Sequence, residues 1–365
     1  MSEIQEYKCP ACGGTMEFDS KLQKMKCPYC DTVFDMSQFE EDVQEKEQPS
    51  KSAASGKDFW GASGDAQWEA GEEEKMKVYV CQSCGGEIIA EDSTGASTCP
   101  YCGNRVVMKE QFKGDLKPDY IIPFKLDKKD AKAAYLKHLK NKVFLPKMFR
   151  NENHIDEMKG VYVPFWLFDV EATAKITYLG EKTRVRRRGD TEYTEHKYYE
   201  AVRSGSMGFE HIPEDGSRKM DDTLMEAVEP YDFSGAVPFQ SAYLAGYVAD
   251  RYDVESRERI GRAKQRVQKS IEKEFQKSVK GYESVTVRDS RIKVTDAKYS
   301  YALYPVWILN STWKDNKYVF AMNGQTGKLV GDLPVDKKLF WKYIGTRGTL
   351  FSVIIFVVLM LLDMV

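Results

Sequence analysis

The sequence is poor in histidine and has no cysteine outside two short segments. Its 365 residues include four histidines, at His138, His154, His196 and His211. None belongs to the H-E-x-x-H pattern with which a helix holds a catalytic zinc ion, so we expect each to be a solvated or core histidine. All eight cysteines lie within residues 7–30 and 79–102, which leaves no cysteine elsewhere to act as a nucleophile.

The sequence also lacks the loops that bind nucleotides or hold a nucleophilic serine. It contains neither G-x-x-x-x-G-K-[ST] nor G-x-G-x-x-G, and the segment 204–208 does not match G-x-S-x-G. Four carboxylates lie in turn-like sequence: Glu214, Asp215, Asp221 and Asp222. We expect them to be solvated; a catalytic pair is the alternative, which nothing else in the sequence supports. These absences together predict that the protein is not an enzyme.

What is present is one cysteine pattern that occurs twice. Residues 7–30 read Y-x-C-x-x-C-G-G, then, after a gap, C-P-Y-C, and residues 79–102 repeat the pattern 72 positions later. In each copy 14 residues separate the second cysteine from the third. This spacing is typical of a tetrathiolate metal site. The predicted metal ligands are Cys9, Cys12, Cys27 and Cys30 in the first copy, and Cys81, Cys84, Cys99 and Cys102 in the second.

We interpret each copy as a small β zinc ribbon with a structural Zn²⁺ ion, two ions in all. Glycine after the second cysteine permits the positive φ that such a turn often needs, and four thiolates fill a tetrahedral shell. So short a segment has almost no core, and structural zinc contributes about 10–16 kcal/mol at neutral pH. Tetrathiolate iron would use the same ligands, so the spacing alone leaves the metal open.

Two other roles for the cysteines are disfavoured. Disulfides would suit a secreted chain, but the N-terminal residues 1–6 are polar and acidic, unlike a signal peptide. A thioredoxin-like redox pair needs one C-x-x-C beside a βαβ pattern, which is absent.

The C-terminus carries the longest apolar run of the chain. Residues 350–362 are uninterrupted by charge, and 345–365 is long enough for a spanning helix. Trp341 and Tyr343 precede the run, and basic residues flank its N-terminal side, which places that side in the cytoplasm by the positive-inside rule. We therefore expect a membrane anchor over 340–365 and a single-pass location in the cell membrane; a buried C-terminal helix is the alternative.

The net charge of −2 conceals an uneven distribution. Residues 1–117 hold 22 acidic and 13 basic residues, a charge of −9, and the remainder holds 34 acidic and 41 basic residues, a charge of +7. Each zinc ion with four thiolates would add −2 to the first part. The cysteine-containing part is therefore predicted to be strongly acidic.

The composition divides the chain into five segments. We expect zinc ribbon 1 over 5–34, an acidic flexible linker over 35–77, zinc ribbon 2 over 78–108, a body over 118–335, and the anchor over 340–365. Trp60 and Trp68 interrupt the linker. They either pack on the second ribbon or the body, or belong to a short motif for a partner.

The body is predicted to be α+β. Helical periodicity follows Asp127 and again covers about 256–279, and an apolar strand covers 160–168. Residues 304–309 resemble residues 164–168, so two related helix-plus-antiparallel-sheet halves are one alternative. The segment 323–328 is predicted to be a hairpin turn.

Basic residues cluster at Arg184–Arg188 and on the helix over about 256–279. The first cluster is expected at a strand end and turn. The ordinary interpretation is that these basic residues form a solvated face and pair with neighbouring glutamates. The two functional interpretations are that they bind anionic lipid headgroups or nucleic acid.

The cysteine units resemble zinc ribbons of the transcription-factor-IIB type. Two ribbons, an acidic linker, a Pro-Phe-Trp body and a hydrophobic tail resemble a group of bacterial membrane proteins. Some of these are labelled replication-restart helicases; others lie in phage-shock-type envelope-stress loci beside phage-shock protein A and flotillin-like (SPFH) proteins. The resemblance is specific only in the ribbons, about one sixth of the chain, and no ATP-binding loop supports the helicase label.

These observations predict a non-enzymatic, membrane-anchored cytosolic adaptor whose ribbons recruit a protein partner. The resemblance implies a role in envelope stress or membrane remodelling, and a phage-shock-protein-A-like or flotillin-like partner. The alternative is a membrane-tethered zinc-ribbon protein that binds nucleic acid, for which the first ribbon offers Lys8, Lys21, Lys24 and Lys26.

Overall fold

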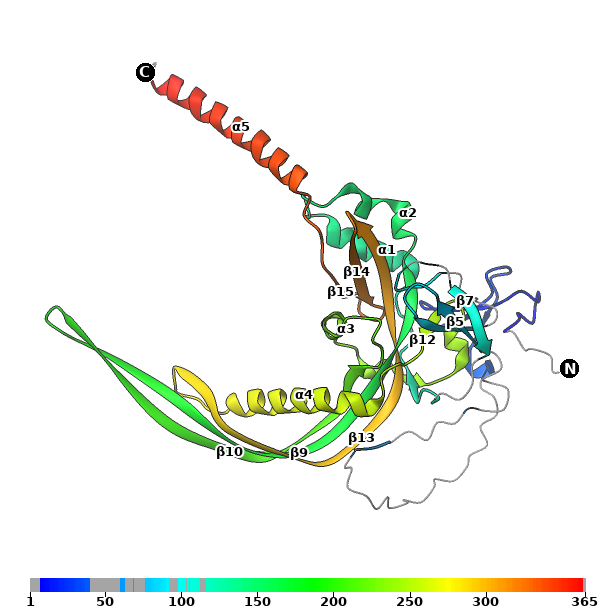
Figure 1. Ribbon diagram of the computed structural model, residues 1–365, viewed down its shortest axis with the longest axis horizontal. Helices are drawn as coiled ribbons and strands as arrows, with labels where there is room; N and C mark the ends of the chain where they lie inside the picture. The colour runs from blue at the N-terminus through cyan, green and yellow to red at the C-terminus, as the bar shows by residue number, and fades with distance from the viewer. Residues whose placement is uncertain are drawn as a thin grey trace.

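The computed structural model describes residues 7–39, 60–62, 68, 76–91, 98–102, 104, 106–111 and 116–363. Its largest feature is a curved antiparallel arm built from three long strands (Figure 1). The strands are β9 (Lys159–Arg188), β10 (Thr191–Asp215) and β13 (Ser284–Trp313). β9 lies between the other two and pairs antiparallel with both.

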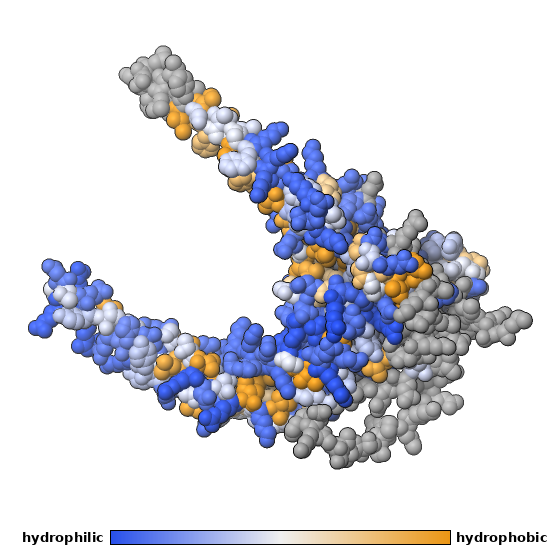
Figure 2. Space-filling model, viewed as in Figure 1, coloured by the Kyte–Doolittle hydropathy of each residue, from blue (hydrophilic) through white to orange (hydrophobic). Residues whose placement is uncertain are grey.

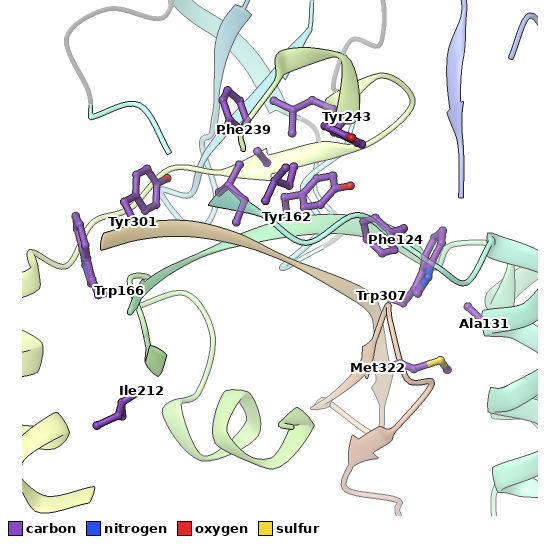
Figure 3. Close-up of a cluster of buried hydrophobic side chains, with 14 of the residues drawn as sticks. Phe124, Ala131, Tyr162, Trp166, Ile212, Phe239, Tyr243, Tyr301, Trp307 and Met322 are labelled. Atoms are coloured by element: carbon purple, nitrogen blue, oxygen red, sulfur yellow. The ribbon is translucent and has the colours of Figure 1, made fainter. Parts of the chain in front are cut away.

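The buried half of β9 is covered on both faces, which explains why its sequence is continuously apolar. Alternate residues point to opposite faces, so Tyr162, Trp166 and Phe168 enter one hydrophobic cluster, while Val163, Phe165 and Leu167 enter another. Figure 3 shows the first cluster, where Phe124 packs against Tyr162 and Trp307. The core of the molecule is therefore centred on β9 and β13.

Short elements complete the body. α1 (Lys128–Leu139) begins at Asp127, whose side chain accepts a hydrogen bond from the Asp130 main chain, as its sequence pattern predicts. β14 (Asn316–Asn323) and β15 (Leu329–Gly331) form the hairpin predicted around 323–328. The remaining elements are β4 (Trp60–Ala62), β8 (Tyr120–Ile121), β11 (Val237–Pro238), β12 (Val248–Asp250), α2 (Glu152–Ile155) and α3 (Asp222–Val228).

α4 (Ser256–Gln276) lies along the inner face of the curved arm (Figure 1). Ala263, Val267 and Ile271 are buried one helical turn apart, which is the stripe that the periodicity predicts. The Tyr178 hydroxyl of β9 donates a 2.6 Å hydrogen bond to the Glu272 carbonyl. This helix therefore fixes the near half of the arm to the body.

The two cysteine segments join the fold differently. The first forms its own three-stranded sheet of β1 (Glu17–Asp19), β2 (Lys24–Lys26) and β3 (Val33–Phe34). The second contributes β5 (Met76–Cys81), β6 (Glu87–Glu91) and β7 (Val106–Gln111) to the large sheet. β6 pairs with β12, which in turn pairs with β9.

The predicted α+β body is wrong, because the molecule is mostly β-sheet. The sequence 164–168 and its echo at 304–309 do not mark two related halves. They lie in β9 and β13, which are neighbouring strands of one sheet: Pro164 faces Leu303, and Trp166 faces Tyr301. The resemblance between the two segments reflects a shared position in the buried centre of that sheet.

The predicted transmembrane helix is also wrong, and with it the predicted single-pass location in the cell membrane. A helix does form, α5 (Lys337–Asp363). Its first turns carry lysines and contact the body, where Phe340 and Tyr343 pack on Phe144. Across the described part of the chain, no helix combines the length and the apolar character needed to cross a membrane.

Both tryptophans of the predicted linker pack on the body. Trp60 lies in β4, which pairs parallel with β13, and its ring contacts Phe168 at 5.4 Å between centroids. Trp68 contacts Phe239 at 5.9 Å. The packing alternative, rather than a partner motif, accounts for these two residues.

Candidate metal centres

The eight predicted ligands come together as two separate tetrads. Their sulfur atoms lie within 4.8 Å of one another in each group. The first tetrad is Cys9, Cys12, Cys27 and Cys30, and the second is Cys81, Cys84, Cys99 and Cys102. Each could hold a metal ion, which is consistent with zinc ribbons.

The sulfur separations suit a tetrahedral ion better than disulfides. Cys9–Cys30 and Cys12–Cys27 are 3.5 Å apart between Sγ atoms. The corresponding pairs of the second tetrad, Cys81–Cys102 and Cys84–Cys99, are 3.4 and 3.6 Å apart. Four sulfurs about 2.3 Å from one ion would lie roughly 3.8 Å apart, whereas a disulfide needs about 2.05 Å.

Tight turns bring each pair of cysteines together. The Gly13 amide donates to the Cys9 carbonyl at 2.7 Å, and the Gly85 amide donates to the Cys81 carbonyl at 2.8 Å. These glycines have φ of 73° and 71°, in the left-handed region that glycine adopts readily. The positive φ predicted after the second cysteine is therefore found in both copies.

Within the tetrads the pKa is lowered at Cys30 and Cys102 but raised at Cys12, Cys84 and Cys99, the last two chiefly by burial. The Thr32 side chain lies 3.1 Å from Cys30 Sγ and lowers the pKa of that thiol to about 6. Burial acts to raise the pKa of Cys102, but hydrogen bonds from Asn104 and the neighbouring cysteines outweigh it and lower the value to about 7. Thiolate is the form that binds metal.

The first ribbon is held to the body by polar and aromatic contacts. Tyr7 Oη lies 2.7 Å from Ser241 Oγ, and the Phe18 amide donates to the Ala245 carbonyl at 3.1 Å. Lys21 pairs with Asp127 at 2.9 Å. One edge of this ribbon is therefore buried against the body, and the other edge faces solvent.

The second ribbon is held by a buried ion pair that the sequence did not suggest. Lys219 Nζ lies 2.7 Å from the carboxylate of Asp250, a fully buried side chain. The same ammonium group donates to the Glu87 carbonyl of β6 at 3.3 Å. Lys159 donates to the Thr98 carbonyl at 2.7 Å, just before Cys99.

One tyrosine distinguishes the two ribbons. Tyr29 and Tyr101 occupy the same place in the two C-P-Y-C segments. Tyr29 is 74% exposed, whereas the Tyr101 hydroxyl is buried beside Asp250, and this burial raises its pKa well above the usual range. The second ribbon is built into the protein, while the first presents its tyrosine to solvent.

The comparison with known proteins adds one relative. The chain is 33% identical to the Bacillus subtilis protein YdjG over 333 residues, which cover 78% of this chain and 98% of YdjG. The chain belongs to the YdjG family. YdjG is itself described as uncharacterized, so family membership supplies no activity. No family model and no solved structure matches the chain.

The lysines that the sequence offered for nucleic acid at the first ribbon are largely engaged. Lys21 pairs with Asp127 and Asp130, Lys24 with Asp35 at 2.7 Å, and Lys26 with Asp31 at 2.8 Å. Ion pairing raises the pKa of Lys26 through Asp31. These contacts leave the first ribbon with less free positive charge than its sequence indicates.

Two carboxylates expected in solvated turns are instead buried. Glu214 and Asp215 are 2% and 5% exposed at the end of β10, under α4. Arg259 reaches Asp215 at 3.2 Å, and Arg262 reaches Glu214 at 3.1 Å. Burial raises the pKa of Asp215 to about 7. The prediction of solvated side chains is wrong for this pair, because α4 packs over the end of β10.

The histidines are dispersed and join neither tetrad. His154 lies 2.6 Å from Ser311 through Nε2, His196 contacts Glu181, and His211 stacks on Phe233. His138 lies in the last turn of α1, where partial desolvation and the nearby Lys142 lower its pKa. Within the residues that the structure describes, the groups able to hold a metal consist of cysteine alone.

Proposed function

We propose that this protein is a non-enzymatic scaffold in which two structural zinc ribbons shape a docking surface for a protein partner. Four thiolates around one Zn²⁺ fill its tetrahedral shell and leave no position for water or substrate. The ion would therefore stabilise each ribbon rather than take part in a reaction. The four-sulfur geometry of both tetrads supports this role.

The observation that carries the docking role is the difference between Tyr29 and Tyr101. A duplicated module that used both copies only for stability would be expected to bury the same residue in each. Here the first ribbon exposes Tyr29 together with Leu22 and Val33, which are 50% and 39% exposed. Exposed aromatic and aliphatic side chains grouped on one small module are typical of a protein-binding surface.

The partner that the resemblance suggests is a phage-shock-protein-A-like or flotillin-like protein. Such partners are rich in basic and amphipathic helices, which would complement the charge of −9 carried by residues 1–117. The exposed apolar side chains of the first ribbon would provide the affinity, and the acidic charge would speed the encounter.

The test measures binding of a purified phage-shock-protein-A-like protein to the full chain. Tyr29→Ala should weaken binding at least 10-fold, since a central aromatic residue contributes about 2 kcal/mol or more at an interface. The matched control is Tyr198→Ala, which removes a tyrosine 60% exposed on the arm and should leave binding unchanged. Equal binding by wild type and Tyr29→Ala would contradict the docking role, while the metal content of both variants should equal that of the wild type.

A further inference from the structure

The far end of the arm is a two-stranded hairpin that no other described element covers. The last pair between β13 and β9 joins Ser284 to Glu181, and beyond it β9 pairs only with β10, from Glu181–Tyr198 to Arg188–Thr191. We call residues 181–198 the arm hairpin. Figure 1 shows it projecting away from the body and from the end of α4.

The strand register divides the arm hairpin into two unlike faces. Side chains alternate between faces along each strand, and paired residues share a face. One face carries five basic residues and one acidic residue; its members are Lys182, Arg184, Arg186, Arg188, Thr191, Tyr193, Glu195 and Lys197. The opposite face has one basic and two acidic residues, namely Arg187, Glu181 and Glu192.

The arginines of this basic face are free to bind a ligand. Arg184, Arg186 and Arg188 form no ion pair with any residue that the structure describes, whereas the single acidic residue, Glu195, already pairs with Lys197 at 3.3 Å. The ordinary interpretation of a basic cluster, a solvated face neutralised by its neighbours, therefore does not apply here. On α4, by contrast, Arg259 and Arg262 are paired with carboxylates.

Aromatic rings accompany the charge. Tyr193 is 57% exposed beside Arg186. At the base of the hairpin, Lys182 lies over the rings of Tyr199 and Tyr282 at 5.6 and 5.4 Å. Figure 2 shows a largely hydrophilic surface at this end of the molecule, unlike the apolar patches nearer α4. Arginine interleaved with exposed tyrosine is typical of surfaces that bind nucleic acid.

We propose that the basic face of the arm hairpin binds double-stranded DNA. A two-stranded β-ribbon, with strands about 4.8 Å apart, fits a major groove about 12 Å wide. Alternate residues of a strand lie about 6.7 Å apart, close to two steps of about 3.4 Å along one DNA strand. Arg184, Arg186 and Arg188 would then contact every second phosphate of one strand, and Tyr193 would pack against sugar or base.

The shape of the hairpin favours a groove over a flat anionic membrane. Its excess of positive charge lies on one face of a narrow, twisted ribbon (Figure 1). Because that face twists along its length, only a few of its side chains could meet a flat surface at once. A DNA groove can follow the twist of the ribbon, so that all the basic residues of this face contact the duplex.

The test uses the full-length, metal-containing protein and a fluorescent DNA duplex of about 30 base pairs, roughly three helical turns. The variant Arg184→Gln/Arg186→Gln/Arg188→Gln removes the three arginines of the basic face. The control is Lys129→Gln/Lys137→Gln/Lys140→Gln, which removes the same charge from exposed positions along α1 and just after it. Thermal unfolding and metal content should match the wild type in both variants, because all six side chains are exposed.

We expect the wild type to lose about 100-fold in affinity between 50 and 200 mM salt, as contact with about four phosphates requires. The arginine variant should bind more weakly, with a salt slope smaller by about 3, and the lysine control should behave like the wild type. The proposal is overturned if the wild type does not bind the duplex at 50 mM salt, if both variants lose the same affinity, or if the arginine variant loses binding only to phosphatidylserine vesicles.

Discussion

At the scale of single residues, the same C-P-Y-C segment places its tyrosine in different surroundings in the two ribbons. Tyr29 and Tyr101 follow the same Cys-Pro dipeptide, yet one is exposed and the other lies beside Asp250. The residues that decide this, Lys219 and Asp250, lie more than a hundred positions from Tyr101 and belong to no motif. Repeats in the sequence could therefore predict the tetrads, but not which ribbon is built into the body.

The Lys219–Asp250 pair gives a residue-scale prediction. Lys219→Met should lower the free energy of unfolding by about 3–5 kcal/mol, because it leaves the fully buried Asp250 carboxylate without its partner. Adding Asp250→Asn should recover part of the loss, since the charge is then gone. Chemical denaturation followed by circular dichroism measures both effects.

The control for this pair is Lys129→Met, an exposed lysine on α1, which should change stability by less than about 0.5 kcal/mol. A Lys219→Met variant as stable as this control would show that the ion pair does not hold the second ribbon in place.

At the scale of elements, periodicity predicted the helices better than the strands. Asp127 and Asp130 located the start of α1, and the stripe through Ala263, Val267 and Ile271 located α4. The arm was largely missed. At the far end of the arm, the strands carry mostly polar residues on both faces. The alternation of apolar and polar residues that marks a half-buried strand is therefore missing there.

Burial under α4 gives an element-scale prediction. Ile271→Ala should destabilise the protein by about 2–4 kcal/mol, because Ile271 is fully buried between α4 and the arm and its removal leaves a cavity. The matched control is Ile344→Ala on α5, where the side chain is 43% exposed. Hydrogen exchange should show faster opening of the near half of the arm in the Ile271 variant only; equal stability of the two variants would contradict the anchoring role of α4.

At the scale of the whole molecule, the sequence predicted the two cysteine tetrads correctly but the role of the C-terminal helix incorrectly. The apolar run near the C-terminus predicted an anchor, but α5 begins among lysines and packs on Phe144, and no described helix meets the requirements of a membrane span. The cysteine pattern succeeded because its spacing is a local geometric constraint. A membrane span depends on the character of a whole helix, which a short apolar run does not establish.

The molecule has three distinct parts: a first ribbon whose Tyr29 faces solvent, a second ribbon built into the large sheet, and an arm that projects from the opposite side (Figure 1). The acidic part carries the ribbons, and the basic part carries the arm. Under the two proposals above, the acidic ribbons would meet a protein partner and the basic arm would meet DNA.

The central claim is that both tetrads hold structural zinc, and metal content tests it most directly. Elemental analysis of protein purified under reducing conditions should find two zinc ions per chain, one for each tetrad. Cys27→Ser should reduce this to one and unfold the first ribbon alone, because the metal supplies most of its folding free energy. Iron in place of zinc, no bound metal, or loss of both ions from the Cys27→Ser variant would contradict the account.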